Sequence, residues 1–151
     1  MRQIILIGLI AIVLLPGSNT MGQGIQFMQG SYREVLEKAK AENKKVFIDF
    51  YTTWCGPCKE MSSKVFTDAD VAKYFNEKFI SYQINAEDKA FATEVSRYEV
   101  TAYPTLVIAD ETGKLLGKQV GACDRSYFLK FAQSATEPDG APRRYHWHHR
   151  P

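Results

Sequence analysis

The sequence has few cysteines, little net charge and no apolar run of the roughly 20 residues that a membrane-spanning helix needs. Three cysteines among 151 residues are too few for a fold that disulfides hold together. A formal charge of +2 gives no support for a nucleic-acid partner or for binding to an anionic membrane surface. The chain also lacks internal repeats and a glycine-rich dinucleotide fingerprint, so we expect neither a nucleic acid nor a cofactor.

The first 24 residues have the pattern of an export signal. One positive residue, Arg2, precedes an uncharged apolar run of twelve residues from Ile4 to Leu15, which ends at Pro16. Gly22-Gln23-Gly24 supplies small residues for cleavage, and no cysteine follows the run that a lipid could modify. We therefore expect residues 1–24 to be a signal peptide and the protein to be exported to a periplasm or cell envelope. An uncleaved N-terminal anchor is the alternative.

Residues 25–135 alternate between strand and helix patterns, as expected for one α/β domain. Short β-rich apolar segments predict strands at 46–51 and 79–84, and a hairpin is predicted from 105–109 and 114–120. Apolar residues at helical spacing predict helices that begin near Ser31, Cys55, Thr67 or Asp68, residue 88 and Asp124. This order predicts a mixed β-sheet with helices on both faces.

The chain loses its apolar periodicity from residue 136 onward, and we expect residues 136–151 to form a disordered tail. This tail contains His146, His148 and His149, which in isolation could bind a transition metal. A flexible segment lacks the surrounding hydrogen bonds that orient metal-bound imidazoles. We therefore predict no metal site.

The segment most informative about chemistry is Trp54-Cys55-Gly56-Pro57-Cys58, whose first cysteine lies six residues after Asp49. Two thiols separated by two residues, with the first at the start of a helix, can cycle between dithiol and disulfide. Half of a zinc site has the same spacing, but zinc requires two further ordered ligands. Cys123 and the histidines near the C-terminus supply these poorly, so a redox pair is the favoured interpretation.

The two cysteines of this pair are expected to have different roles. Cys55 meets unpaired backbone N–H groups and the positive end of the helix dipole, which lower its pKa from the reference of about 8.5. We predict that Cys55 is the nucleophile. Cys58, one turn further and less exposed, is predicted to resolve the mixed disulfide.

The stretch from Val46 to Lys59 closely resembles thioredoxin, and a later Tyr103-Pro104-Thr105 strengthens the resemblance. Lys64 to Val71 also resembles exported thioredoxin-like proteins and the periplasmic C-terminal domain of the membrane thiol:disulfide interchange reductase. Together these resemblances cover about residues 30–134. They imply the α/β thioredoxin fold, in which helices flank both faces of a central mixed sheet.

The resemblance implies a catalytic role for Asp49, which matches a carboxylate buried behind the active site. There it accepts the proton of the resolving thiol through water. Desolvation would raise its pKa toward neutrality, as a base of this kind requires. The alternative is an aspartate at the end of a strand that turns to solvent.

The resemblance also implies a groove for substrate. Pro104 matches a cis-proline that pairs with extended substrate backbone, and Tyr103 matches the position that discriminates partners. Gly121 matches a glycine that completes the groove, and Trp54 is expected to pack on the substrate. The expected substrate-binding residues are Trp54, Gly56, Pro57, Tyr103, Pro104 and Gly121.

Two positions depart from thioredoxin. Gln83 stands where many thioredoxins have a lysine beside the buried aspartate, so we expect proton transfer to be tuned differently. Cys123 is an additional cysteine two residues after Gly121. It is expected to be a small apolar residue packed at the start of the last helix, with a regulatory or partner-linking thiol as the alternative.

These features predict an exported thiol:disulfide oxidoreductase that mainly reduces protein disulfides. The Gly56-Pro57 pair matches thioredoxin, and no histidine stands between the two cysteines to stabilise the thiolate and make the disulfide more oxidising. The expected partners are disulfide-containing proteins and an upstream electron donor such as a membrane thiol:disulfide reductase, with the protein itself a monomer. The alternatives are a disulfide oxidase or isomerase and a non-catalytic peptide-binding or chaperone module.

Overall fold

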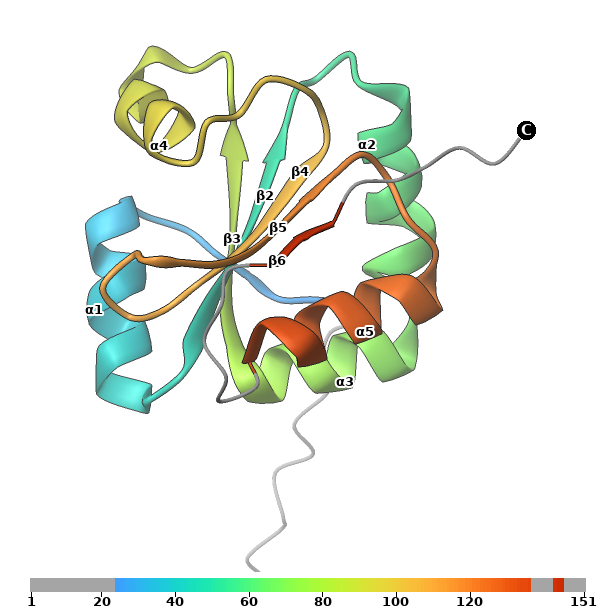
Figure 1. Cartoon of the computed structure of the whole chain (residues 1–151), viewed down its shortest axis with the longest axis horizontal. Helices are drawn as coiled ribbons and strands as arrows, with labels where there is room; N and C mark the ends of the chain where they lie inside the picture. Colours follow the sequence, from blue (N-terminus) through green and yellow to red (C-terminus); the bar gives the residue numbers. More distant parts are fainter. Residues whose placement is uncertain (1–23, 137–142, 146–151) are drawn as a thin grey trace, which may run out of the picture.

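The computed structural model describes residues 24–136 and 143–145, which form one α/β unit (Figure 1). The expectations for the signal peptide through residue 23 and for the three histidines near the C-terminus lie outside these residues. Six strands form one sheet in the order β1-β3-β2-β4-β5-β6. Their bounds are β1 Phe27–Met28, β2 Lys45–Tyr51, β3 Phe79–Asn85, β4 Thr105–Ala109, β5 Leu115–Val120 and β6 Arg143–Tyr145.

The sheet is mixed, as the sequence predicts. Strands β1, β3 and β2 are mutually parallel, whereas β4 runs antiparallel to both β2 and β5, and β6 joins β5 in parallel. Because β2 and β3 are parallel and in register from Lys45 to Tyr51, both strands end at the same edge of the sheet. The loops that follow these two strands therefore lie side by side.

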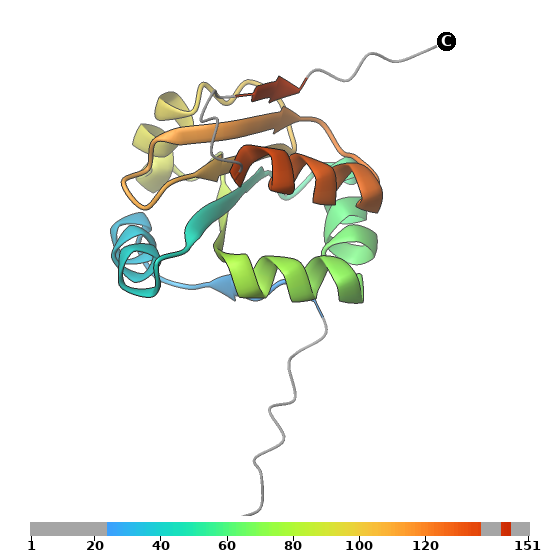
Figure 2. The same ribbon diagram turned by 60° about the horizontal axis from the view of Figure 1, so that its bottom comes forward.

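Helices cover both faces of the sheet, with α1 and α4 on one side and α2, α3 and α5 on the other (Figures 1 and 2). Their bounds are α1 Tyr32–Glu42, α2 Gly56–Glu60, α3 Ala69–Lys78, α4 Ala92–Arg97 and α5 Arg125–Thr136. A π-helical turn, η1 (Met61–Val65), continues α2, and a short 3₁₀ turn, η2 (Lys89–Phe91), precedes α4. The predicted α/β thioredoxin-type fold is thus confirmed.

Side chains at the helix starts behave as the sequence indicates. Ser31 and Glu34 form both halves of a capping box at the start of α1. The Oδ1 atom of Asp68 accepts from the backbone N–H groups of Asp70 and Val71, so Asp68 is the residue that caps α3.

Two apolar clusters lie on opposite faces of the sheet. Successive side chains of β2 belong to different clusters, because side chains along a strand point to opposite faces of the sheet in turn. Phe47 packs with Phe75 and Phe128 on the side of α3 and α5, with ring centroids of Phe75 and Phe128 4.4 Å apart. Phe50 packs with Tyr98 on the side of α1 and α4. Asp49 lies on the same face of the sheet as Phe47, so its carboxylate points to the face covered by α3 and α5.

Three local features differ from the expectations. Strand β1 was not expected, and the Asn76 side chain anchors it by bonding the Gln26 N–H and the Gly24 carbonyl. The helix expected from residue 55 to 64 changes to a π-helical turn, in which the Phe66 N–H bonds the Met61 carbonyl and the Phe66 ring enters the core. Strand β6 lies within the stretch expected to be a tail and was not predicted, because its pairing with β5 depends on contacts remote in sequence.

Candidate active site

The disulfide between Cys55 and Cys58 lies just beyond the end of β2, at the start of α2. Cys55 is the N-cap residue of α2, with extended backbone, and its Sγ accepts from the Cys58 N–H at 3.1 Å. Pro57 occupies the first turn of α2, where a backbone N–H would have no partner within the helix, so the N–H that proline lacks is not missed. The local sequence therefore places one sulfur against the donor end of the helix, as the CxxC spacing predicts.

Both cysteines are buried, with 3% of Cys55 and 4% of Cys58 exposed. The expected difference in exposure between the two cysteines does not appear in this disulfide form. The Sγ of Cys55 is bonded to the Cys58 sulfur and also accepts from the Cys58 N–H.

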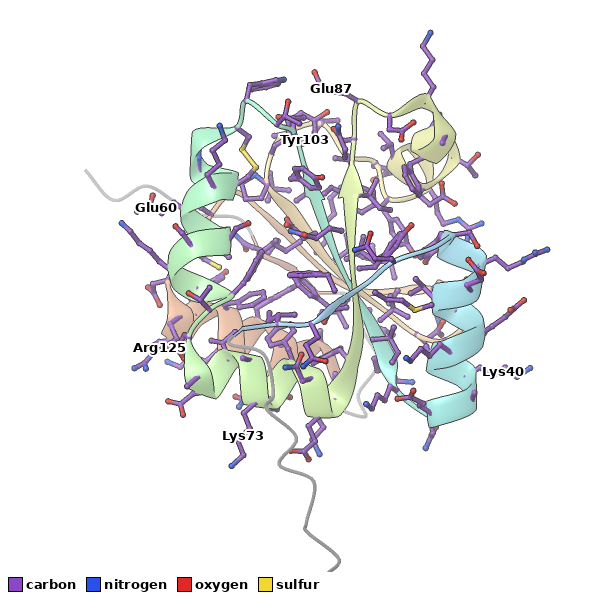
Figure 3. All side chains as sticks on the ribbon, turned by 180° about the vertical axis from the view of Figure 1, so that it is seen from behind. Lys40, Glu60, Lys73, Glu87, Tyr103 and Arg125 are labelled. Carbon is purple, nitrogen blue, oxygen red and sulfur yellow. A yellow bond between two sulfur atoms is a disulfide. The ribbon has the colours of Figure 1, made fainter. Side chains whose placement is uncertain are left out.

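Trp54 is the large hydrophobic residue that the described chain leaves exposed, with 65% of its surface accessible. Its Nε1–H donates to Glu87 Oε1 at 2.9 Å, and its ring meets Tyr103 edge-on with centroids 6.0 Å apart. Figure 3 shows Tyr103 and Glu87 at the same end of the molecule as the disulfide. Sequence reasoning missed Glu87, because an acidic residue in a loop looks the same as any solvated carboxylate.

Asp49 is buried, with 1% of its surface exposed, so the alternative of an aspartate turned to solvent is wrong. It lies opposite Gln83 in the β2–β3 pair, and its Oδ2 accepts from Gln83 Nε2 at 3.0 Å. Among the described residues, its Oδ1 has no hydrogen-bond partner. Burial raises the pKa of Asp49 from 3.8 to about 6, and the Gln83 hydrogen bond opposes this rise.

A pocket of about 580 Å³ lies beside Cys58 of the disulfide. Gln83, which bonds Asp49, lines this pocket together with Cys58, Thr52 and Lys59. Cys58 and the amide that bonds Asp49 therefore line the same pocket.

The loop before β4 contains the cis peptide bond expected between Tyr103 and Pro104. The Pro104 carbonyl accepts from the Gly121 N–H at 2.8 Å, so the structure brings together the two expected walls of the groove. Gly121 has φ +89°, a backbone conformation that favours glycine, and a Cβ there would meet no atom within 4 Å. The contact between Tyr103 and Trp54 joins this pair of loops to the disulfide.

Gln119 is a second residue that sequence reasoning missed. It is fully buried in β5, and its amide bonds the Val120 carbonyl at the end of that strand and the Tyr127 hydroxyl of α5. The signal in the sequence was a polar residue at an inward position of a strand, two residues after Gly117. Its hydrogen bond from the Tyr127 hydroxyl, however, comes from an element eight residues further along.

Cys123 lies in the apolar cluster between the sheet and α5. Its N–H donates to Met61 Sδ at 3.4 Å, and burial raises the pKa of its thiol to about 12. This environment agrees with the expected packing role. Within residues 24–136 and 143–145, no three His, Cys, Asp or Glu side chains are grouped to hold a metal. In the same part of the chain, no helix is long and apolar enough to cross a membrane.

A mixed α/β sheet with a CxxC disulfide at a helix start, next to a cis-proline loop, defines a thiol:disulfide oxidoreductase. Comparison with protein families matches residues 32–136 to the thioredoxin-like domain. The chain therefore belongs to the thioredoxin-like family, and it is a member that retains the redox pair Cys55 and Cys58.

Curated relatives include thioredoxins and a larger protein. Thioredoxin from Echinococcus granulosus is 36% identical over 59% of this chain and 77% of its own length. Thioredoxin-1 from Drosophila melanogaster is 37% identical over 50% of this chain and 65% of its own length. The thiol:disulfide interchange protein DsbD of Yersinia pestis is 28% identical over 64% of this chain but only 17% of that protein.

Solved structures agree with the family. A Bacteroides thetaiotaomicron protein provisionally named a disulphide isomerase has a TM-score of 0.70 and 39% identity, covering 78% of this chain and 98% of its own. A thioredoxin from Thermus thermophilus has a TM-score of 0.65 and 24% identity over 75% of this chain and 88% of its own, and it supports the fold alone.

Proposed function

We propose that this protein is an exported enzyme that mainly reduces disulfides in other proteins. The observation that carries the proposal is the Cys55–Cys58 disulfide, which caps α2 and shares a cavity with Gln83, the partner of buried Asp49. These residues supply a nucleophile, a resolving thiol and a base.

In the proposed reaction, the reduced protein begins with Cys55 as a thiolate. It attacks one sulfur of the substrate disulfide, that S–S bond breaks, and the second substrate sulfur leaves as a thiolate that takes up a proton. Asp49 then accepts the proton of Cys58 through water. The Cys58 thiolate attacks the Cys55 sulfur, which releases the other substrate sulfur and forms the intramolecular disulfide.

The groove residues are proposed to align the substrate for this attack. Trp54 offers an exposed aromatic surface, and the space beside Gly121, whose N–H bonds the Pro104 carbonyl, is open. Gly56 and Pro57 are exposed between the two cysteines, and Tyr103 packs against Trp54. An extended polypeptide can contact all of these groups at once.

The reducing direction is supported by the residues between the cysteines. Gly56 and Pro57 provide no histidine that would stabilise the reduced form and so make the disulfide a stronger oxidant. The leader-like N-terminus supports export. The relative named thiol:disulfide interchange protein supports exchange with another dithiol protein, and we propose a membrane thiol:disulfide reductase as the electron donor. Two electrons from such a donor's dithiol would regenerate the reduced pair. We propose that the protein acts as a monomer.

A disulfide isomerase is the second candidate, because the Bacteroides thetaiotaomicron relative carries that provisional name. The reduction potential separates the two. We expect a value close to the roughly −270 mV of thioredoxin for a reductase, and one nearer −180 mV for an isomerase. Equilibration of the full chain with glutathione or dithiothreitol buffers would measure it.

The decisive test is capture of substrates in the envelope of the native cell. Cys58→Ser removes the resolving thiol, so Cys55 should accumulate mixed disulfides that dithiothreitol releases. Cys55→Ser should trap none and should abolish reduction of insulin. Full activity of Cys55→Ser would favour the non-catalytic peptide-binding module, and capture only by Cys55→Ser would reverse the two roles.

A further inference from the structure

Gln119 is a polar side chain buried at the junction of β5 and α5, with none of its surface exposed. Its Nε2 group donates to the carbonyls of Val120 at 2.9 Å and Gly121 at 3.5 Å. Its Oε1 accepts from the Tyr127 hydroxyl at 3.2 Å. Because a buried amide is costly unless it is hydrogen-bonded, this arrangement favours one conformation of the chain where β5 ends.

That stretch of backbone is one wall of the substrate groove. The Gly121 N–H donates to the Pro104 carbonyl at 2.8 Å, so the position of one loop depends on the other. On the opposite wall, the buried Thr105 hydroxyl donates to the Ala102 carbonyl at 2.7 Å and holds the chain before Pro104. A series of hydrogen bonds thus runs from α5 through Gln119 to the cis-proline loop.

The loops that contain Pro104 and Gly121 should affect the reduction of a disulfide in a polypeptide more than that of a small-molecule disulfide. A substrate sulfur carried in a polypeptide must be brought to Cys55 with its chain running past Trp54, Pro104 and Gly121. A Cβ on Gly121 would meet no atom within 4 Å, so the space beside this glycine is open to a partner. A small-molecule disulfide can reach the sulfur without contacting this backbone.

We propose that Gln119 is a positioning residue that gives the active site its selectivity for disulfides held in extended polypeptides. This inference rests on the proposed function. Gln119 forms no bond with substrate and takes no part in electron transfer. It holds the Gly121 and Pro104 backbone in place, so that an extended chain can pack in the open space beside Gly121. Misplacement of a binding group by about 1 Å can cost 10²-fold in rate.

The test compares two disulfides with the full reduced chain. Gln119→Leu removes the amide and keeps a similar volume. We expect kcat/KM for insulin to fall about tenfold, mainly through KM, while the rate with a small aromatic disulfide changes less than about twofold. Tyr127→Phe, which removes one donor to Gln119, should shift the ratio of the two rates in the same direction by a smaller factor.

Gly117→Ala is the matched control for a purely structural effect. An added Cβ would lie 2.8 Å from the Ala135 Cβ and 3.1 Å from Phe131 Cε2, so it disturbs the same β5–α5 contact without touching the Gly121 loop. It should lower the melting temperature yet leave the ratio of the two rates unchanged.

A parallel loss with both substrates in Gln119→Leu, or no loss with either, would overturn the inference. Should Gln119→Leu fail to fold, an unchanged ratio in Tyr127→Phe would overturn it equally. If the wild-type protein reduces neither disulfide, the proposed function itself is wrong. Failure of the proposed function can therefore be told apart from failure of the inference about Gln119.

Discussion

At the scale of single residues, Asp49 has an environment that few carboxylates share. It is buried, its Oδ2 accepts from a neutral amide, and burial outweighs that bond in raising its pKa to about 6. In this disulfide form, burial and the Gln83 hydrogen bond are the causes that set the pKa of Asp49, and on the β4 side its neighbour in register is the apolar Leu106. Gln83 is therefore the polar side chain through which this pKa can be adjusted.

Gln83→Lys should move the pH dependence of disulfide resolution to lower pH. A cation beside Oδ2 stabilises the ionised carboxylate and lowers its pKa below about 6, by roughly 1 to 3 units for a close pair. Because the base must be ionised to accept a proton, resolution should begin at lower pH, and it should be slower above pH 7 because the base is weaker. The rate of release from a mixed disulfide on Cys55, followed from pH 4 to 8, measures the shift.

Gln26→Lys adds the same charge at an exposed position beside β1 and should leave the midpoint in place. An unchanged midpoint in Gln83→Lys would show that Asp49 is not the base.

At the scale of secondary-structure elements, the site is assembled from loops at one edge of the sheet. The chain after β2 carries the disulfide, and Tyr51 at its end pairs in register with Asn85 at the end of β3. The loop after β3 carries Glu87, which bonds Trp54 directly before the disulfide. This one hydrogen bond joins two neighbouring loops across the site.

Glu87→Ala should free the Trp54 side chain without lowering stability, because a hydrogen bond between exposed groups contributes little to folding. We expect lower fluorescence anisotropy for Trp54 and a several-fold higher KM for a protein disulfide, as the aromatic surface is no longer held in place. Trp147 is the second tryptophan, so the measurement uses a Trp147→Phe background.

Glu87→Gln keeps an acceptor oxygen and is expected to behave like the wild type. Equal loss in both variants would indicate that the charge of Glu87 acts on the substrate instead of its bond to Trp54.

At the scale of the whole molecule, two apolar clusters stabilise the sheet from opposite faces, and an ionisable group is buried beside one of them. The folded state raises the pKa of Asp49 from 3.8 to about 6. Its contribution to stability is therefore fully present below about pH 4, and it is lost as the pH rises through 6.

Asp49→Asn should flatten this part of the pH dependence of unfolding. The wild-type free energy of unfolding should decrease by about 3 kcal/mol on account of Asp49 between pH 4 and pH 8. The variant, which cannot ionise there, should be the more stable protein near neutral pH while resolving mixed disulfides slowly. Denaturant unfolding of both oxidised proteins across this range measures the difference. If the free energies of unfolding of the two proteins change in parallel with pH, ionisation of Asp49 does not destabilise the folded state.

The sequence by itself determined most of the elements and the reactive pair, because both depend on local chemistry. The capping box at Ser31, the apolar runs of β2 and β3, and the spacing of Cys55 and Cys58 each act within one or two helical turns or one strand. The resemblance to thioredoxin, carried by the residues around this pair, added the buried carboxylate at Asp49 and the cis bond before Pro104.

The tertiary structure decided what depends on residues remote in the chain. Only pairing of β2 with β3 places Gln83 on Asp49, and only the adjacent loop ends bring Glu87 to Trp54. Packing of α5 on β5 gives the buried amide of Gln119 its Tyr127 partner, and β6 pairs with β5 at the edge of the sheet. Burial and hydrogen bonding across such distances have no local pattern, so these partners became visible only in the folded molecule.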